Sequence, residues 1–386
     1  MADGRLVETY RHGIDGAWGY PTSSQDFLFH VVHPVKPGAR APLYVVLHSA
    51  GHTSWTALEA GFRQSPDGTY NDHGLYHAPD DCYGLYLAGD SWWGRDVPGD
   101  PTQFVDQDSP VERRVLDTVA WVVGKYGVDP VRVYLAGISM GGSGALGIGM
   151  RHGDIFAATV VWVPAGTQHV ARRMGFGQPL VAGLTIPDPP VVLNLSAQND
   201  AWSKGQEVLI EGCCERRYAL VMGWGPFGHT GDTRLYVRHC GAVMSFPWYE
   251  MRQDQAYPVF TAATTDQRPP WLHPEDGGDE QGQVNAWFRW QNVEDCAASF
   301  RMRLWLDLPA AAADESAAAS VVSVADLALR RLQRFRVPHE KHAVWELVRE
   351  ERIVAAGTVA PDASGLLVLP RVPITTTPAE LRVTRT

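Results

Sequence analysis

The sequence predicts an α/β protein in which a mostly parallel sheet is covered by helices on both faces, followed by a C-terminal all-β, sandwich-like domain. Three observations support this prediction. Continuous apolar runs of strand length alternate with helical stretches over the first two thirds of the 386 residues. These runs end in loops of small and polar residues, and beyond about residue 256 a period-two alternation replaces the helical stretches. We therefore expect one domain over residues 1–255 and a second over residues 256–386.

The N-terminal elements are read from apolar periodicity and from Gly/Pro punctuation. Apolar residues spaced along one helical face, at Val111, Val115, Val119 and Val122, predict the longest helix. The expected elements are edge strands at 6–10 and 27–32, buried strands at 42–47 and 83–87, and helices at 55–63 and 110–126.

The stretch Val131 to Gly149 predicts a strand, a sharp turn and a helix. Gly137-Ile-Ser139-Met-Gly141 fits the pattern G-x-S-x-G, in which a serine sits in strained backbone at the tip of a strand-to-helix turn. The flanking glycines lack side chains, so strand and helix can approach each other. By itself this pattern also fits a glycine-rich turn with an incidental serine, and the rest of the chain has to decide.

The α/β order continues after this turn. We expect strands at 156–163, 191–195 and 218–224, an irregular insertion at 166–190, and a polar helix ending near residue 217. The strand at 218–224 is expected to be the last of the sheet. In such sheets ligands bind beyond the carboxyl ends of the strands, so the loops there are the place to look for a site.

The C-terminal residues predict strands without a helical layer. The expected strands lie at 284–290, 300–306, 343–348, 366–369 and 381–384, with a Pro/Gly-rich linker at 267–283 and an alanine-rich insertion at 309–320. Nothing in this part resembles a catalytic cluster. Packing against the first domain and binding of a glycan are both open as its role.

A nucleophilic serine needs a base within hydrogen-bond reach and a group that orients the base. Asp200 follows the strand after the turn, and His229 follows the next strand, which gives the chain order Ser, Asp, His. We assign Ser139, Asp200 and His229 as the catalytic residues. Taken singly, Asp200 also fits a helix N-cap and His229 a structural loop histidine, and Glu207 and Asp232 are rival acids.

Attack on a carbonyl also needs donors for the oxyanion. The backbone N–H of Met140, directly after the serine, is one expected donor. The second is expected from the loop His48-Ser49-Ala50-Gly51, with Ala50 favoured and Ser49 next. The same residues would also be expected in a tight turn that requires small side chains and has no catalytic role.

The residues Gly137-Ile-Ser-Met-Gly-Gly-Ser-Gly-Ala-Leu146 and Arg151-His-Gly-Asp-Ile-Phe156 resemble the α/β-hydrolase esterases of the esterase D, feruloyl esterase and acetyl xylan esterase group. The resemblance covers about residues 25–240. It implies a serine carboxylesterase that acts on acylated sugars or related small esters. A peptidase or an acyltransferase on the same residues, or a glycan-binding protein with a vestigial hydrolase domain, are the alternatives.

Tryptophans gather in loops at the strand ends, where their flat faces could stack on a sugar ring or an aromatic acid. They could also pack these loops for structural reasons. The candidate substrate-binding residues are Trp55, Trp92, Trp93, Trp202 and Trp224.

Composition narrows the partners. A net charge of −10 without a Lys/Arg cluster argues against nucleic acid or an anionic membrane as partner. Five cysteines without a C-x-x-C pair argue against a disulfide framework or a zinc site, and we expect no metal or cofactor. The chain as given has no signal-peptide pattern, which predicts a cytoplasmic protein, or a secreted or periplasmic one if an export signal was removed. The oligomeric state is left open.

Overall fold

The structure is a computed structural model that describes residues 4–13, 18–20, 27–36, 38, 40–63, 74–92, 104–308 and 322–386. The alanine-rich insertion expected at 309–320 and the candidate residue Trp93 lie outside these residues.

Within the described residues, eight strands from the first 224 residues and one later strand form a sheet of nine strands. In spatial order these are β1 (Val7–Arg11), β2 (Leu28–Val32), β4 (Tyr83–Leu87), β3 (Leu43–Leu47), β5 (Val133–Ile138), β6 (Ala158–Trp162), β7 (Val191–Ser196), β8 (Leu220–Trp224) and β10 (Gly282–Val284). The strands from β4 to β8 run parallel to one another, and β1, β2 and β10 pair antiparallel at the edges. This strand order, with the serine turn directly after the central β5, is the α/β-hydrolase arrangement and confirms the predicted fold class.

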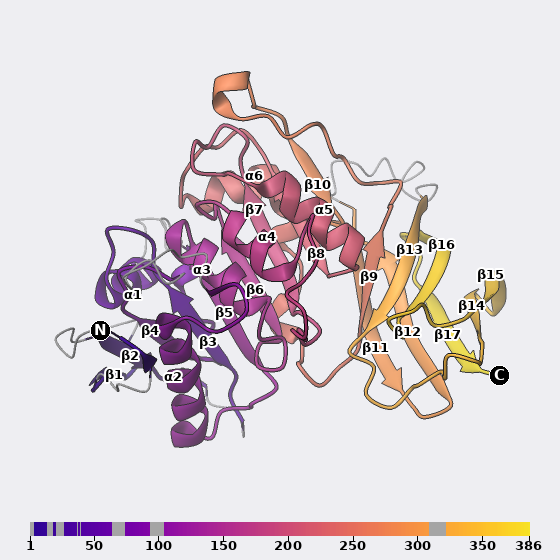
Figure 1. Cartoon of the computed structure of the whole chain (residues 1–386), viewed down its shortest axis with the longest axis horizontal. Coiled ribbons are helices and arrows are strands. Elements are labelled where there is room, and N and C mark those ends of the chain that lie inside the picture. The colour runs from indigo at the N-terminus through magenta and orange to yellow at the C-terminus, as the bar shows by residue number, and fades with distance from the viewer. Residues whose placement is uncertain are drawn as a thin grey trace.

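Helices cover both faces of this sheet (Figure 1). The helices of the described residues are α1 (Ser54–Phe62), α2 (Pro110–Tyr126), α3 (Met140–Gly149), α4 (Gln168–Met174), α5 (Gln206–Arg216) and α6 (Thr233–Met244), with the short 3-10 helices η2 (Gly74–Tyr76), η4 (Trp248–Glu250) and η5 (Pro274–Asp276). Successive residues of a strand point to opposite faces. Tyr44 and Val46 accordingly pack with α1 and α6, whereas Val45 and Leu47 pack with α2, α3, α4 and α5.

The helix α2 shows why some bounds can be read from sequence. Ser109 accepts from the Glu112 N–H and Glu112 accepts from the Ser109 N–H, which closes a capping box at its start. Gly127 ends it with φ 65°, a left-handed conformation that favours glycine. Both ends carry local signals, and the predicted range is confirmed.

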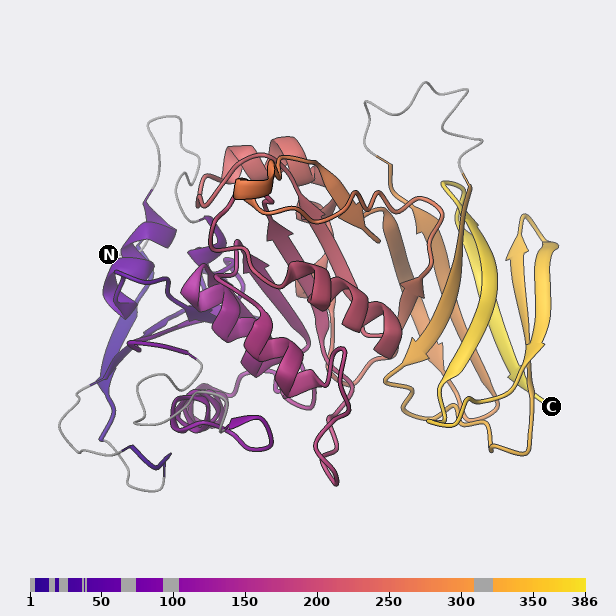
Figure 2. The ribbon, with the colours of Figure 1, turned by 45° about the horizontal axis from the view of Figure 1, so that its top comes forward.

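The remaining strands form two antiparallel sheets that share a hydrophobic core (Figure 2). One sheet has the order β11 (Phe288–Asp295), β12 (Ser299–Leu306), β17 (Ala379–Arg385), β14 (Ala343–Arg349) and β15 (Arg352–Val359), and the other has β16 (Leu367–Thr375), β13 (Val322–Arg330) and β9 (Tyr257–Thr261). Their core continues into the core on the α1/α6 face of the large sheet. The C-terminal part therefore packs against the large sheet through a shared hydrophobic core and is not merely connected to it by a linker.

An arginine at the end of β13 also joins the two parts. Arg330, at the end of β13, donates to the carbonyls of Arg216 and Arg217 at 2.6 and 2.8 Å, and its guanidinium pairs with Asp188 at 2.5 Å. The last carbonyls of a helix have no partner within the helix. The guanidinium of Arg330, at the end of β13, supplies hydrogen-bond donors to the carbonyls at the end of α5.

Three expectations about the elements were wrong. The segment 166–190 contains α4, and the strand at 218–224 is not the last of the sheet, because β10 pairs with β8. The expected strand at 284–290 is divided between β10 and β11, which belong to different sheets. The break falls at Asn285, which has φ 55° and caps the carbonyls of Leu220 and Phe260 with its side chain. No helix among the described residues has the length and apolar character needed to cross a membrane.

Candidate active site

Ser139 occupies the tip of the turn between β5 and α3. Its backbone has φ 56° and ψ −119°, a conformation that costs a non-glycine residue about 1–3 kcal/mol and persists only where the surroundings impose it. The Ser139 N–H donates to the Trp162 carbonyl at 3.0 Å, and its own carbonyl accepts from the N–H groups of Ser143 and Ala165. The hydroxyl is thus held at the carboxyl end of the sheet.

The glycines on both sides of Ser139 are required by close approach. A Cβ on Gly137 would lie 2.2 Å from the Gly141 carbonyl oxygen, and a Cβ on Gly141 would lie 1.9 Å from the Leu47 carbonyl oxygen. Both contacts are with backbone, which cannot move aside without shifting a strand. The expectation that these positions exclude side chains is confirmed.

Gly141→Ala is expected to destabilise the protein by about 3 kcal/mol or more and to remove activity, because the methyl group forces α3 away from β3. Gly124→Ala is the matched control, since residue 124 lies in the exposed last turn of α2 and a Cβ there meets no atom within 4 Å. It should raise stability by about 0.5–1 kcal/mol. Chemical denaturation of both variants tests this; equal stabilities would contradict it.

The three side chains predicted from chain order come together at this edge. The Ser139 Oγ lies 2.8 Å from His229 Nε2, and His229 Nδ1 lies 2.7 Å from Asp200 Oδ2. A carboxylate can only accept, so Nδ1 carries the proton and Nε2 is left to accept from the serine hydroxyl. The arrangement can remove a proton from Ser139 and stabilise the resulting imidazolium.

The acid is enclosed, whereas the base is open to solvent. Asp200 is 1% exposed, and its Oδ1 accepts from the Trp202 N–H at 2.8 Å. The His229 side chain is 30% exposed, so a ligand can reach it. Gly228, with φ 63°, turns the chain so that His229 points back at Ser139.

The rival acids lie at the starts of helices. Asp232 caps the N-terminus of α6 by accepting from the Arg234 N–H, and it also pairs with the Arg234 guanidinium at 2.7 Å. Glu207 lies in the first turn of α5. The N-cap of α5 is Gly205, so the alternative that Asp200 caps this helix is wrong.

The candidate oxyanion donors differ in availability. Among the described residues, the N–H groups of Met140 and Ala50 have no hydrogen-bond partner. The Ser49 N–H already donates to the Tyr76 hydroxyl at 2.8 Å, so Ser49 is wrong as a donor. Tyr76 is buried and 27 positions along the chain, and no sequence signal could have indicated this contact.

Hydrogen bonds of His48 hold the loop that carries Ala50. The His48 ring lies 2.9 Å from the Ser49 carbonyl and accepts from the Gly89 N–H at 3.2 Å, while the His48 carbonyl accepts from the Trp92 indole N–H at 2.9 Å. Burial lowers the pKa of His48, so it is neutral at pH 7. A neutral ring can accept from Gly89, which a protonated one could not.

The tryptophans separate into two groups. Trp55 and Trp202 are 45% and 64% exposed and can offer a face to a ligand. Trp92 and Trp224 are each 1% exposed, so the expectation that they stack on a substrate is wrong. Trp92 fills the space beside Gly144, and Trp224 packs over Gly282 and against Trp271.

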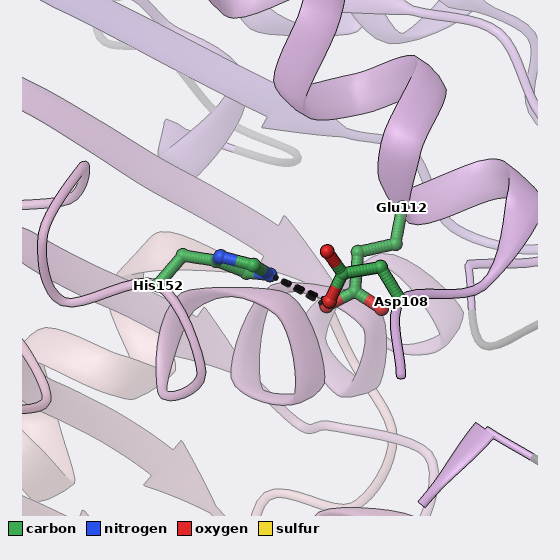
Figure 3. Close-up of side chains that lie close together, drawn as sticks. All are labelled: Asp108, Glu112 and His152. Carbon is green, nitrogen blue, oxygen red and sulfur yellow. Dashed lines mark hydrogen bonds and ion pairs between the residues drawn. The ribbon is translucent and has the colours of Figure 1, made fainter. Parts of the chain in front are cut away.

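A second titratable cluster lies away from Ser139, where Asp108, Glu112 and His152 meet (Figure 3). Their ligand atoms lie within 4.8 Å of one another, a spacing that a metal ion could use. The carboxylate of Glu112 is fully buried, however, and already accepts from Ser109, from Arg173 at 2.6 Å and from His152 at 3.0 Å. These contacts describe an ion-pair network joining α2 to the ends of α3 and α4.

This network predicts a pH-dependent stability. Burial alone would lower the pKa of His152, but hydrogen bonds and charge from Asp108 and Glu112 outweigh it and raise the pKa to about 9. A group with a raised folded pKa stabilises the protein fully below its unfolded value near 6.5 and loses this contribution as pH rises through 9. We expect the free energy of unfolding to fall by on the order of 3 kcal/mol between pH 6 and 9.5 from this residue.

Thermal and chemical denaturation of wild type and His152→Gln at both pH values measures this contribution. The variant should be less stable at pH 6 and should change less between the two pH values. Parallel pH dependences of the two proteins would contradict the assignment.

No protein-family model and no curated protein matches the chain. Similar solved structures include a thermostable esterase, with 18% identity and a TM-score of 0.42 over 65% of this chain and 64% of that one, so that less than two thirds of that esterase is matched. Another is an S-formylglutathione hydrolase from Agrobacterium tumefaciens, with 15% identity and a TM-score of 0.40 over 60% of this chain and 90% of that one. A third is an acetyl xylan esterase from Aspergillus awamori, with 13% identity and a TM-score of 0.39 over 63% of this chain and 98% of that one.

Proposed function

We propose that this protein is a serine carboxylic-ester hydrolase in which Ser139, His229 and Asp200 form the catalytic triad. The observation that carries the proposal is the continuous chain of hydrogen bonds from Ser139 Oγ through both ring nitrogens of His229 to Asp200, at 2.8 and 2.7 Å. A serine hydroxyl on a strained turn with an oriented base is the arrangement that acyl transfer requires.

In the proposed reaction the Ser139 Oγ attacks the ester carbonyl carbon while its proton passes to His229 Nε2. The negative charge on the carbonyl oxygen is stabilised by the N–H groups of Met140 and Ala50. Collapse breaks the bond to the alcohol, which leaves with the proton from Nε2. Water, losing a proton to the same nitrogen, then attacks the acyl-enzyme and releases the acid, and the proton returns to Ser139. Asp200 holds the ring and stabilises its charged form throughout.

For the substrate we propose an acylated sugar or a related small ester. The exposed faces of Trp55 and Trp202 support this class, because an indole face stacks well on a sugar or a phenolic ring. The Trp202 backbone N–H donates to Asp200 Oδ1 at 2.8 Å, so Trp202 belongs to the loop that carries the proposed acid. The proposed catalytic unit is residues 1–255, with residues 256–386 as the appended part.

A panel of substrates tests this function. Wild type should hydrolyse p-nitrophenyl acetate, acetylated oligosaccharides and feruloylated oligosaccharides, with kcat/KM far above that for peptide p-nitroanilides. A preference for the amides would replace the esterase by a peptidase. Transfer of the acyl group to added alcohols in preference to water would replace it by an acyltransferase.

A further inference from the structure

Residues 268–281, between β9 and β10, form a closed loop, which we call the excursion. Gln267 and Gln283 bond each other through their backbones at 3.0 and 2.8 Å, which closes residues 268–281 at the base. Gly282 is paired with Trp224, the last residue of β8, in an antiparallel register. The excursion therefore lies beyond the carboxyl end of β8 (Figure 2). The loops that carry Asp200 and His229 follow the carboxyl ends of the parallel strands β7 and β8 and so lie at the same edge of the sheet.

The side chain of Gln198 forms hydrogen bonds to residues near both the start and the end of this excursion. Its Nε2 donates to the Pro270 carbonyl at 3.0 Å, and its Oε1 accepts from the Glu280 N–H at 3.0 Å. Gln198 is 1% exposed, so its amide is withdrawn from bulk water. A buried amide with both ends satisfied by backbone from two different segments holds those segments in one position.

The next two residues continue the connection into the site. Asn199 Oδ1 accepts from the Gly228 N–H at 2.8 Å, which ties the acid loop to the loop before His229. Asp200 then bonds His229 itself. Three successive side chains thus link the excursion, the acid loop and the histidine loop.

We propose that Gln198 is a positioning residue, which makes the excursion 268–281 a working part of the active site. It acts through Asp200 and does not touch substrate. This inference rests on the proposed function, because a positioning role requires that the triad is catalytic. It assigns to the C-terminal residues a contribution to the reaction in addition to packing on the large sheet.

The distinction between positioning and simple attachment can be made with a matched control. Gln281, on the same excursion, donates to the His239 carbonyl at 3.2 Å and so fastens the excursion to α6 without touching the acid loop. Gln281→Ala loosens the attachment alone. Gln198→Ala removes both hydrogen bonds between residue 198 and the excursion. Gln198→Glu keeps an acceptor for the Glu280 N–H but loses the donor to the Pro270 carbonyl.

We expect Gln198→Ala to lower kcat on p-nitrophenyl acetate about 10-fold or more with KM changed less than two-fold, because a misplaced base slows chemistry rather than binding. Gln198→Glu should not recover the loss, because a carboxylate oxygen would then face the Pro270 carbonyl without a donor, and Gln281→Ala should stay near wild type. The proton NMR signal of His229 Nδ1–H, shifted downfield by its bond to Asp200, should broaden or vanish in Gln198→Ala and persist in Gln281→Ala. All proteins are assayed below the onset of their own unfolding transitions.

Wild-type kcat in Gln198→Ala, or equal losses in Gln198→Ala and Gln281→Ala, would overturn the inference while leaving the esterase proposal intact. A wild type that hydrolyses no ester overturns the proposed function. The NMR signal is measured independently of turnover: if it is unchanged in Gln198→Ala, the positioning role is wrong whatever the activity.

Discussion

Ser139→Ala is expected to reduce ester hydrolysis to the background of the assay, a loss of about 10³-fold or more in kcat, with the fold intact. The substitution removes only the hydroxyl group, whose oxygen is the atom proposed to bond the acyl carbon. The backbone conformation at residue 139, which the surrounding hydrogen bonds impose, is accessible to alanine at a similar cost. Steady-state kinetics and labelling with a fluorophosphonate probe measure the effect.

Ser143→Ala is the control for this substitution. Ser143 lies one turn further along α3, and its buried hydroxyl donates to the Gly166 carbonyl at 2.7 Å. This variant should keep its turnover and its labelling, with mass spectrometry placing the adduct on Ser139. Labelling that persists in Ser139→Ala would mean that another residue is the nucleophile.

Asp200→Asn is expected to lower kcat by about 10⁴-fold while the protein stays folded. An amide at this position can present its NH₂ group to His229 Nδ1, which would place the ring proton on Nε2. The ring would then donate towards Ser139 instead of accepting from it. The geometry remains but the base is lost, so binding of substrate should change far less than kcat.

Asp232→Asn separates this effect from the removal of a nearby charge. Asp232 is the other acid of the same region and caps α6. Its replacement should leave kcat close to wild type and cost at most about 1 kcal/mol of stability. If Asp232→Asn lost activity and Asp200→Asn did not, the acid of the triad would have to be reassigned.

Much of the fold was predictable because its signals are local. The helix α2 carries its own capping box and its C-terminal glycine, and the buried strand β3 is an unbroken apolar run. The helix α6 was missed although Asp232 caps it and Tyr236, Cys240 and Val243 supply a buried face. Treating Asp232 as a rival acid concealed its role as a cap.

The candidate site was predictable where chain order and chemistry coincide. Ser139, Asp200 and His229 each follow a buried strand, and parallel strands bring their carboxyl ends to one edge of the sheet. The supporting contacts were not predictable. Trp92 looked like its exposed counterparts in sequence, and only the space above Gly144 decided that it is buried.

The sequence by itself determined the parallel sheet, the serine turn and the identity of the three residues proposed for catalysis, because apolar periodicity, glycine spacing and chain order are properties of short segments. Only the tertiary structure decided which backbone N–H groups are free for an oxyanion and what holds the acid loop. These depend on contacts such as Ser49 with Tyr76 and Gln198 with Pro270, whose partners are 27 and 72 positions apart. A hydrogen bond across such a separation leaves no periodic trace in the sequence, since it arises only when folding brings two distant segments to the same edge.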